Sequence, residues 1–313
     1  MGIRGLTYGI SPVIKSFSFD EFNGKIVLID GFYIIHKYFR TCRKKYADKD
    51  LNIETIKMIL NFIEICIIKN IKPVFIFDGK APAEKIKEVE KRRLNQEKIK
   101  IKIEETIDEN EKKRLKNALN PHPSLLYNVM KFFQNSNLPY YKAFGEADKL
   151  CASLLSKDRE KIIGVFSGDT DFLVYGFKYL FVDLSFRDKM FIGYALDEVQ
   201  TLLNFKNVNL FIDFCIFLGS DYNRGVKKGF DYLTKIFRDN SDITEIEKIL
   251  NISDHGEFSF VKRIFSTEKE IDKLTKRSYK KNETMNIDIQ PYKDKLEKLN
   301  SYHILDDSSH FSL

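Results

Sequence analysis

The spacing of apolar residues changes in a regular order along this chain. Between residues 24 and 183, short apolar runs such as KIVLID, PVFIFD, KIIGVFS and KYLFVDL alternate with longer segments whose apolar residues recur every three or four positions. Short continuous runs are typical of strands buried on both faces, and the longer segments are typical of amphipathic helices. The alternation predicts an α/β fold with a mainly parallel central sheet and helices on both of its faces.

The helical spacing places individual helices. Past Ala195 the pattern is helical throughout. We expect a core of residues 1–222 and a helical extension of residues 223–313. We expect the charged end of the extension to be partly disordered, above all its last ten residues. The predicted helices are Ile34–Tyr46, Glu54–Asn70, Ser124–Gln134, Ala147–Leu155, Leu196–Leu203, Leu210–Leu218, Phe230–Phe237 and Ile243–Leu250.

Acidic residues occur where the predicted strands end. Asp30 closes KIVLID, Asp78 closes PVFIFD, and two more aspartates follow the strand-like stretch IIGVF. In an open α/β sheet, the crevice beyond the carboxyl ends of the strands is where ligands bind. We therefore expect seven carboxylates to meet at one place: Asp30, Asp78, Glu146, Asp148, Asp169, Asp171 and Asp221.

Gathering bare carboxylates costs free energy. At about 6 Å and an effective dielectric constant of about 20, each pair repels by roughly 3 kcal/mol, so the cluster needs cations. Oxygen ligands without Cys or His suit Mg²⁺, with Mn²⁺ as a substitute, rather than zinc. Two such ions suit the hydrolysis of a phosphodiester. Ordinary helix caps and turns would explain any one of these acids, but not the whole set.

Composition narrows the class of protein further. The chain has 313 residues, 43% of them hydrophobic, which is enough for a sizeable core, and its net charge is only +7. Four cysteines without CxxC spacing indicate free thiols in a reducing compartment. The absence of an apolar run of about 18 residues predicts no membrane span.

One segment is far more charged than the rest. Residues 80–119 hold 13 basic and 9 acidic side chains. A solvated helical pair with ion pairs four residues apart is one interpretation. The other is a helical insertion, residues 80–135, that stands over the acidic site. We favour the insertion because it follows Asp78 directly, and because Lys85 and Arg92, seven residues apart, would share a helix face toward a phosphate.

Several motifs occur in the order and spacing of a known family. They are MGIRGL, IDGFYIIHK, FIFDGKAPAEK, FGEAD, SGDTDFLVYG and FLGSDY, and they extend from Met1 to about Phe237. The chain resembles the XPG-like family of 5′ flap endonucleases and 5′–3′ exonucleases, and is most similar to its exonuclease branch. The resemblance implies a PIN-like nuclease core, a helical arch and a helix–hairpin–helix-like part that binds duplex DNA.

The resemblance also implies an activity. It is that of a Mg²⁺-dependent DNA nuclease that cuts 5′ flaps, digests from 5′ ends and leaves 5′ phosphates, in replication, repair or recombination. Its partners would be DNA with flaps, nicks or ends, and the protein is expected to be a monomer. It would work in the nucleus, or at a cytoplasmic replication site if the genome is viral. A PIN-like ribonuclease and an inactive branched-DNA scaffold are the alternatives.

The resemblance assigns roles to individual residues. The seven acids become metal ligands, and Lys85 and Arg92 become the catalytic basic pair at the base of the arch. His36 matches a residue whose ring stacks on a base, and Gly2 matches one that lies close to DNA. The remaining predicted DNA contacts are Arg93, Gly225, Lys227, Lys228 and Gly229.

Two departures from the family pattern stand out. The segment SDYNRGVKKGFDYL has glycines but lacks the proline of the family's turn, where the family binds a potassium ion. The resemblance implies a K⁺ site at Gly225–Gly229, although the missing proline departs from the family's turn. The tail HILDDSSHFSL has a single Phe and no Gln before it, so no sliding-clamp-binding motif is found.

Overall fold

A seven-stranded sheet forms the centre of the protein in a computed structural model. The structure describes residues 2–46, 50–80, 85–136, 140–205, 207–252 and 255–266. The strand order is β1-β7-β6-β5-β2-β3-β4, and β6, β5, β2, β3 and β4 run parallel, whereas β7 pairs antiparallel with both of its neighbours, β6 and β1. The predicted α/β class and the mainly parallel sheet are therefore confirmed. The strands are β1 Lys15–Ser18, β2 Ile26–Asp30, β3 Lys72–Phe77, β4 Tyr140–Lys142, β5 Ile162–Phe166, β6 Tyr179–Ser185 and β7 Met190–Ala195.

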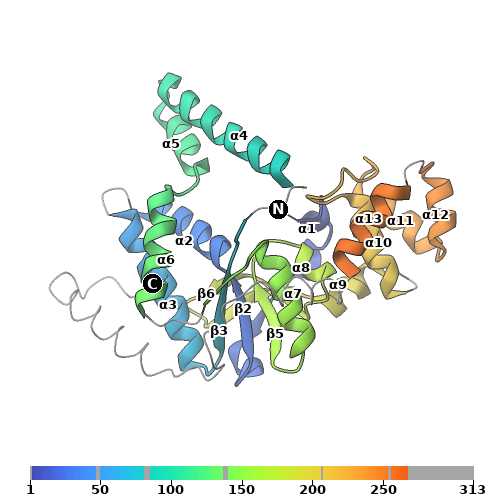
Figure 1. Cartoon of the computed structure of the whole chain (residues 1–313), viewed down its shortest axis with the longest axis horizontal. Helices are drawn as coiled ribbons and strands as arrows, with labels where there is room; N and C mark the ends of the chain where they lie inside the picture. Colours follow the sequence, from blue (N-terminus) through green and yellow to red (C-terminus); the bar gives the residue numbers. More distant parts are fainter. Residues whose placement is uncertain are drawn as a thin grey trace.

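Helices cover both faces of this sheet, as Figure 1 shows. Along β2, Leu28 faces one apolar cluster and Ile29 faces the other, because side chains alternate along a strand. The first cluster takes buried residues from α7 Ala147–Lys157, α8 Asp171–Val174, α9 Leu196–Leu203 and α10 Val208–Leu218. The second cluster takes them from α2 Gly31–Lys45, α3 Leu51–Ile68 and α6 Pro123–Ser136.

The C-terminal helices join the first cluster. Leu233 and Phe237 of α11 (Phe230–Asp239), Ile246 of α12 (Ile243–Ile249) and Val261 of α13 (His255–Ser266) are all buried in it. They therefore share a core with the sheet. The expected disorder of the last ten residues lies outside the described part of the chain.

The charged segment forms two helices, α4 Ile86–Glu105 and α5 Glu109–Ala118. In Figure 1 they project away from the sheet, in teal and green, while α6 packs on it. Leu125 and Val129 of α6 are almost fully buried, so α4 and α5 are the projecting part of the predicted insertion. Among the described residues, no helix is long and apolar enough to cross a bilayer.

Some elements were not predicted. They are the edge strands β1 and β4, the strand β7 beside β1, the single turn α1 (Leu6–Gly9), the 3₁₀ turns Ser11–Val13 and Phe19–Phe22, and α13. β1, β4, α1 and the 3₁₀ turns are each three or four residues long, too short to show an apolar period. In β1, for example, Phe17 is the one buried residue of four. Such a strand pairs with β7 through its backbone, which leaves little trace in the side chains.

Candidate metal centre and active site

The parallel strands deliver three acidic segments to one edge of the sheet. In the register of β2 and β3, Asp30 pairs with Ile76, so Asp78 extends two residues beyond the same edge. The loop after β5 crosses to β2, where Ser167 Oγ donates to Asp30 Oδ2 at 2.8 Å. The other oxygen of Asp30 accepts the backbone N–H of Tyr33 at 3.0 Å and caps α2. Asp30 is therefore both a helix cap and a wall of the site.

The start of α7 supplies two further carboxylates. Asp78 Oδ1 accepts the backbone N–H of Ala147 at 2.7 Å, which ties β3 to the helix N-terminus. Glu146 is the N-cap of α7 in extended backbone conformation, and Asp148 lies in the first turn. Residues two apart would not share a face inside a helix. Because Glu146 precedes the helix, both side chains reach the same site, as the sequence required.

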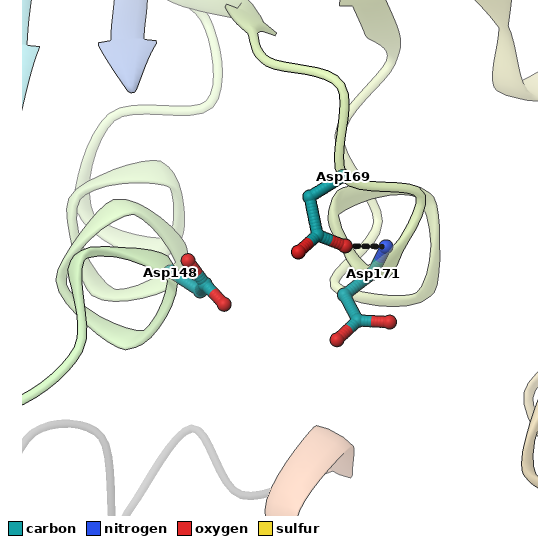
Figure 2. Close-up of side chains that lie close together, drawn as sticks. All are labelled: Asp148, Asp169 and Asp171. Carbon is teal, nitrogen blue, oxygen red and sulfur yellow. Dashed lines mark hydrogen bonds between the residues drawn. The ribbon is translucent and has the colours of Figure 1, made fainter. Parts of the chain in front are cut away.

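Three aspartates form the tightest group. Ligand oxygens of Asp148, Asp169 and Asp171 all lie within 4.8 Å of one another, and Figure 2 shows their carboxylates turned toward a common space. Asp169 Oδ1 also accepts the backbone N–H of Asp171 at 2.9 Å, the dashed line in Figure 2. Asp171 Oδ1 is buried without a hydrogen-bond partner among the described residues. An oxygen-only group with an unsatisfied buried carboxylate fits a hard divalent cation such as Mg²⁺.

The electrostatics of the group agree with this donor set. Burial, followed by the charge of neighbouring carboxylates, raises the pKa of Asp148 and Asp171 well above the ordinary value. Burial is also the main cause that raises the pKa of Asp78 and Asp169, and it raises the pKa of Asp30 to about 7. Such a site binds either protons or cations, since both relieve the same repulsion.

Two cations from the arch contact the acidic group. Lys85, the N-cap of α4, forms an ion pair with Glu146 and lies 3.9 Å from Asp221 Oδ2. Arg92, two turns along α4, donates to the same Asp221 oxygen at 2.8 Å. Burial opposes the charge of Lys85, but the carboxylates outweigh it and raise its pKa. Both cations therefore lie beside the acids, and their catalytic role stays a prediction.

Comparisons with known proteins agree with this geometry. A family model described as the XPG N-terminal domain matches residues 1–99, and one described as the XPG I-region matches residues 137–221. This chain belongs to the XPG family. The relatives include flap endonuclease 1 of Theileria parva, 28% identical over 86% of this chain and 57% of that protein. They also include flap endonuclease 1 of Candida glabrata, 29% identical over 82% of this chain and 70% of that protein.

The chain spans little more than half of the Theileria relative's length. Two solved structures share the fold of this chain. The catalytic core of Rad2 in complex with DNA substrate superposes with a TM-score of 0.57, at 19% identity, over 93% of this chain and 85% of that chain. Flap endonuclease-1 from Methanococcus jannaschii superposes with a TM-score of 0.58, at 23% identity, over 92% and 95% of the two chains. These likenesses confirm the PIN-like nuclease fold that the motifs predicted.

The N-terminal segment of this XPG-family chain lies against the metal centre. Gly2 has φ +93°, and a Cβ there would lie 2.5 Å from Asp169 Oδ1 and 2.6 Å from Thr170 N. The next residue, Ile3, donates its N–H to Thr170 Oγ1 at 2.9 Å. Glycine is therefore required for both backbone and space. The structure brings Gly2 to the acidic group; its predicted contact with DNA stays a prediction.

Two other predicted DNA contacts lie on helices. His36 is half-buried on α2, and burial lowers its pKa to about 4, so its ring is neutral near pH 7. Arg93 is exposed on α4, where it bonds Glu90 and pairs with Glu97 of the same helix. Neither geometry tests a contact with DNA, and both roles stay predictions.

The glycine turn connects α10 with α11. Gly225 has φ +64°, and a Cβ there would meet the Leu218 carbonyl at 2.5 Å, which explains why glycine stands there. Lys227, Lys228 and Gly229 are exposed along the turn. Gly229 caps α11 without a side chain. These residues present a basic surface next to a helix N-terminus.

Tyr222 is an aromatic residue of the site that was not predicted from the sequence. The hydroxyl of Tyr222 donates to Glu146 Oε2, and Lys85 Nζ lies 4.5 Å from the centre of its ring. Lys149 Nζ lies 5.7 Å from the same ring. Tyr222 therefore orients both partners of the Lys85–Glu146 ion pair. Its place directly after Asp221 was the one available signal.

Proposed function

We propose that this protein is a metal-dependent, structure-specific DNA nuclease that cuts 5′ flaps and digests DNA from 5′ ends. It hydrolyses phosphodiesters and leaves 5′ phosphates. The observation that carries the proposal is the meeting of two parts at one place. A buried group of aspartates lies at the edge of the sheet, and two cations from the projecting helices contact the acids beside it. Membership of the XPG family supports the same reaction.

The roles of the residues follow from their positions. The seven acids would hold two Mg²⁺ ions, with Mn²⁺ as a substitute: Asp30, Asp78, Glu146, Asp148, Asp169, Asp171 and Asp221. When bound, such ions supply Lewis acidity toward the phosphodiester and activate a water molecule. Lys85 and Arg92 neutralise charge that develops on the phosphoryl oxygens. Tyr222 keeps Lys85 and Glu146 aligned.

The rest of the molecule would hold the substrate. Basic residues of the Gly225–Gly229 turn contact phosphates of the duplex and carry little sequence preference. We also propose that this turn binds a potassium ion and that the protein is a monomer. It would act in replication, repair or recombination, in the nucleus or at a cytoplasmic replication site of a virus. The inactive-scaffold alternative is disfavoured because all seven acidic positions are filled.

One gel tests the proposal. The substrates are 5′-labelled flap, nicked and blunt duplexes, with matched RNA flaps, each incubated with Mg²⁺ and with EDTA. We expect Mg²⁺-dependent cutting of DNA flaps and ends and little cutting of RNA. Preferential cutting of the RNA flaps would support the ribonuclease alternative, and no cutting of any substrate would support the scaffold.

Asp171→Ala serves as the active-site variant in the same gel. Cleavage should be lost, while DNA binding is kept or tightened, because a repulsive carboxylate is removed from beside a polyanion. A binding assay in EDTA on the flap substrate measures the second part. Wild-type turnover by Asp171→Ala in Mg²⁺ would contradict the assignment of the metal centre.

A further inference from the structure

Two buried polar atoms near the acidic group have no hydrogen-bond partner among the described residues: Asp171 Oδ1 and the hydroxyl oxygen of Tyr175. Tyr175 is only 8% exposed. A buried polar group left unpaired costs about 1–3 kcal/mol, so such groups usually contact a water molecule or an ion. One of the two is an acceptor and the other a donor. A single water molecule between them would satisfy both.

Helix geometry brings the two residues together. Tyr175 lies four positions after Asp171, at the C-terminal end of α8, and its backbone N–H donates to the Asp171 carbonyl at 3.0 Å. Side chains four apart on a helix share a face. The charges acting on the phenol agree: after burial, the carboxylates of Asp148, Asp171, Glu146 and Asp169 raise the pKa of Tyr175. A phenol has an ordinary pKa of about 10, so near pH 7 the hydroxyl carries its proton and can donate a hydrogen bond.

The ring of Tyr175 is held from behind by α13. Its ring centroid lies 5.2 Å from that of Phe265, and the ring centroid of Phe265 lies 6.0 Å from that of Tyr222. Tyr222 in turn bonds Glu146. The ring is thus packed against α13, and the charged groups that act on its hydroxyl are the acids of the site. Packing alone would be served equally well by phenylalanine, so the hydroxyl needs its own explanation.

We propose that Tyr175 is a positioning residue of the metal centre, whose hydroxyl donates to a water molecule shared with Asp171. The inference rests on the proposed function and adds a residue to it. Magnesium keeps several water molecules when it binds protein carboxylates. Partners that orient the ligands of a metal typically change its affinity by about 10- to 100-fold. Tyr175 therefore sets how tightly Asp148, Asp169 and Asp171 hold a divalent ion.

Tyr38 provides a matched control. Its hydroxyl is also buried and unpaired among the described residues, but it belongs to the second apolar cluster, on the other face of the sheet. The charged or polar groups that act on it are Cys66, Asp183 and Tyr33 rather than the acidic group. Tyr38→Phe and Tyr175→Phe thus remove the same atom from two buried rings, which lie on opposite faces of the sheet.

The test is calorimetric titration of Mn²⁺ into the full chain without DNA, for wild type, Tyr175→Phe and Tyr38→Phe. We expect Tyr175→Phe to weaken Mn²⁺ binding by about tenfold or more and Tyr38→Phe to leave it unchanged. Thermal midpoints in EDTA should show that both variants are folded, and that of Tyr38→Phe should stay the same or rise, since it loses an unpaired buried hydroxyl.

Three outcomes would overturn the inference. The first is a Tyr175→Phe affinity within about twofold of wild type. The second is equal weakening in both variants, which would indicate a general effect of lost hydroxyls. The third is a wild-type chain that binds no Mn²⁺. A chain that binds Mn²⁺ but cuts no DNA would contradict the proposed function alone, and the comparison of affinities would still decide the role of Tyr175.

Discussion

Asp30 shows how one side chain serves both the fold and the site. One oxygen caps α2 through the Tyr33 N–H, and the other accepts from Ser167. These bonds favour the charged form, yet burial outweighs them and raises the pKa of Asp30 to about 7. The charged carboxylate at this position lowers the free energy of unfolding, because an uncharged side chain would be buried there at a lower free-energy cost.

A pH dependence of stability follows. The folded pKa of Asp30, about 7, exceeds its ordinary value of 3.8, so the folded state binds the proton more tightly. Its contribution to stability is fully present below about pH 4 and is lost as the pH rises through about 7. Asp78, Asp148, Asp169 and Asp171 are shifted in the same direction. In EDTA, we expect the free energy of unfolding to fall between pH 4 and 7.

Asp30→Asn should make that fall shallower, because the amide keeps the size and an accepting oxygen but does not ionise. Urea unfolding in EDTA across this pH range measures it. Asp20→Asn, at an exposed carboxylate paired with Lys69, is the control and should leave the slope unchanged. Parallel curves for wild type and Asp30→Asn would contradict the burial argument.

The acidic residues were predictable because most of them follow an apolar run that marks a strand end. Tyr175 and Tyr222 were not. An aromatic residue at helical spacing is interpreted as core, and Tyr175 does pack as core. What makes either residue part of the site is the hydroxyl, and the surroundings of a hydroxyl are set by tertiary contacts between distant segments. Local pattern contains no information about them.

At the scale of elements, α4 separates into a base and a shaft. Lys85 and Arg92 at the base contact acids of the site, whereas Lys98, farther along, is exposed. A charge that acts mainly on the transition state lowers the rate when removed, and typically by about 10²–10³-fold. A charge that only contacts phosphate lowers affinity instead.

We therefore expect Lys85→Ala and Arg92→Ala each to slow saturated single-turnover cleavage by about tenfold or more, with DNA affinity changed by less than about fivefold. Lys98→Ala should change affinity or nothing. Quench-flow kinetics with saturating enzyme, together with binding in EDTA, separate the two effects. If all three variants behave alike, the helix is a general basic surface and the catalytic assignment is wrong.

The turn between α10 and α11 gives a second prediction for an element. Lys227 and Lys228 are exposed next to the N-terminus of α11, where phosphate binding is favoured. Each phosphate contact contributes about −0.9 to the log–log slope of affinity against salt concentration. Replacing both lysines by alanine should make the slope shallower by about 1 to 2 units.

Fluorescence anisotropy on duplex DNA at several salt concentrations measures this slope. Lys161→Ala, an exposed lysine directly before β5 at the opposite edge of the sheet, serves as the control. An unchanged slope in the double variant would mean that the turn does not touch the DNA backbone.

At the scale of the molecule, the sequence predicted the class of fold but not its edges or its interior joins. The buried strands β2, β3 and β5 were predictable because each is a continuous run of apolar residues. The helices α11 to α13 were predicted only in part, and nothing in the sequence indicated that Val261 and Phe265 enter the same core as the sheet. The packing of α13 affects the site, because Phe265 contacts the rings of Tyr175 and Tyr222 beside the metal centre.

The ion pairs at the base of α4 have one more consequence. Lys85 pairs with Glu146, and Arg92 pairs with Asp221. Divalent ions would bind the same two carboxylates. Competition for shared ligands is a negative coupling, and coupling between two sites is reciprocal. Metal loading should loosen the arch from the sheet, and a substrate phosphate that draws Lys85 away should tighten metal binding. On the proposed function, the metal centre would then bind its ions most tightly once DNA is seated.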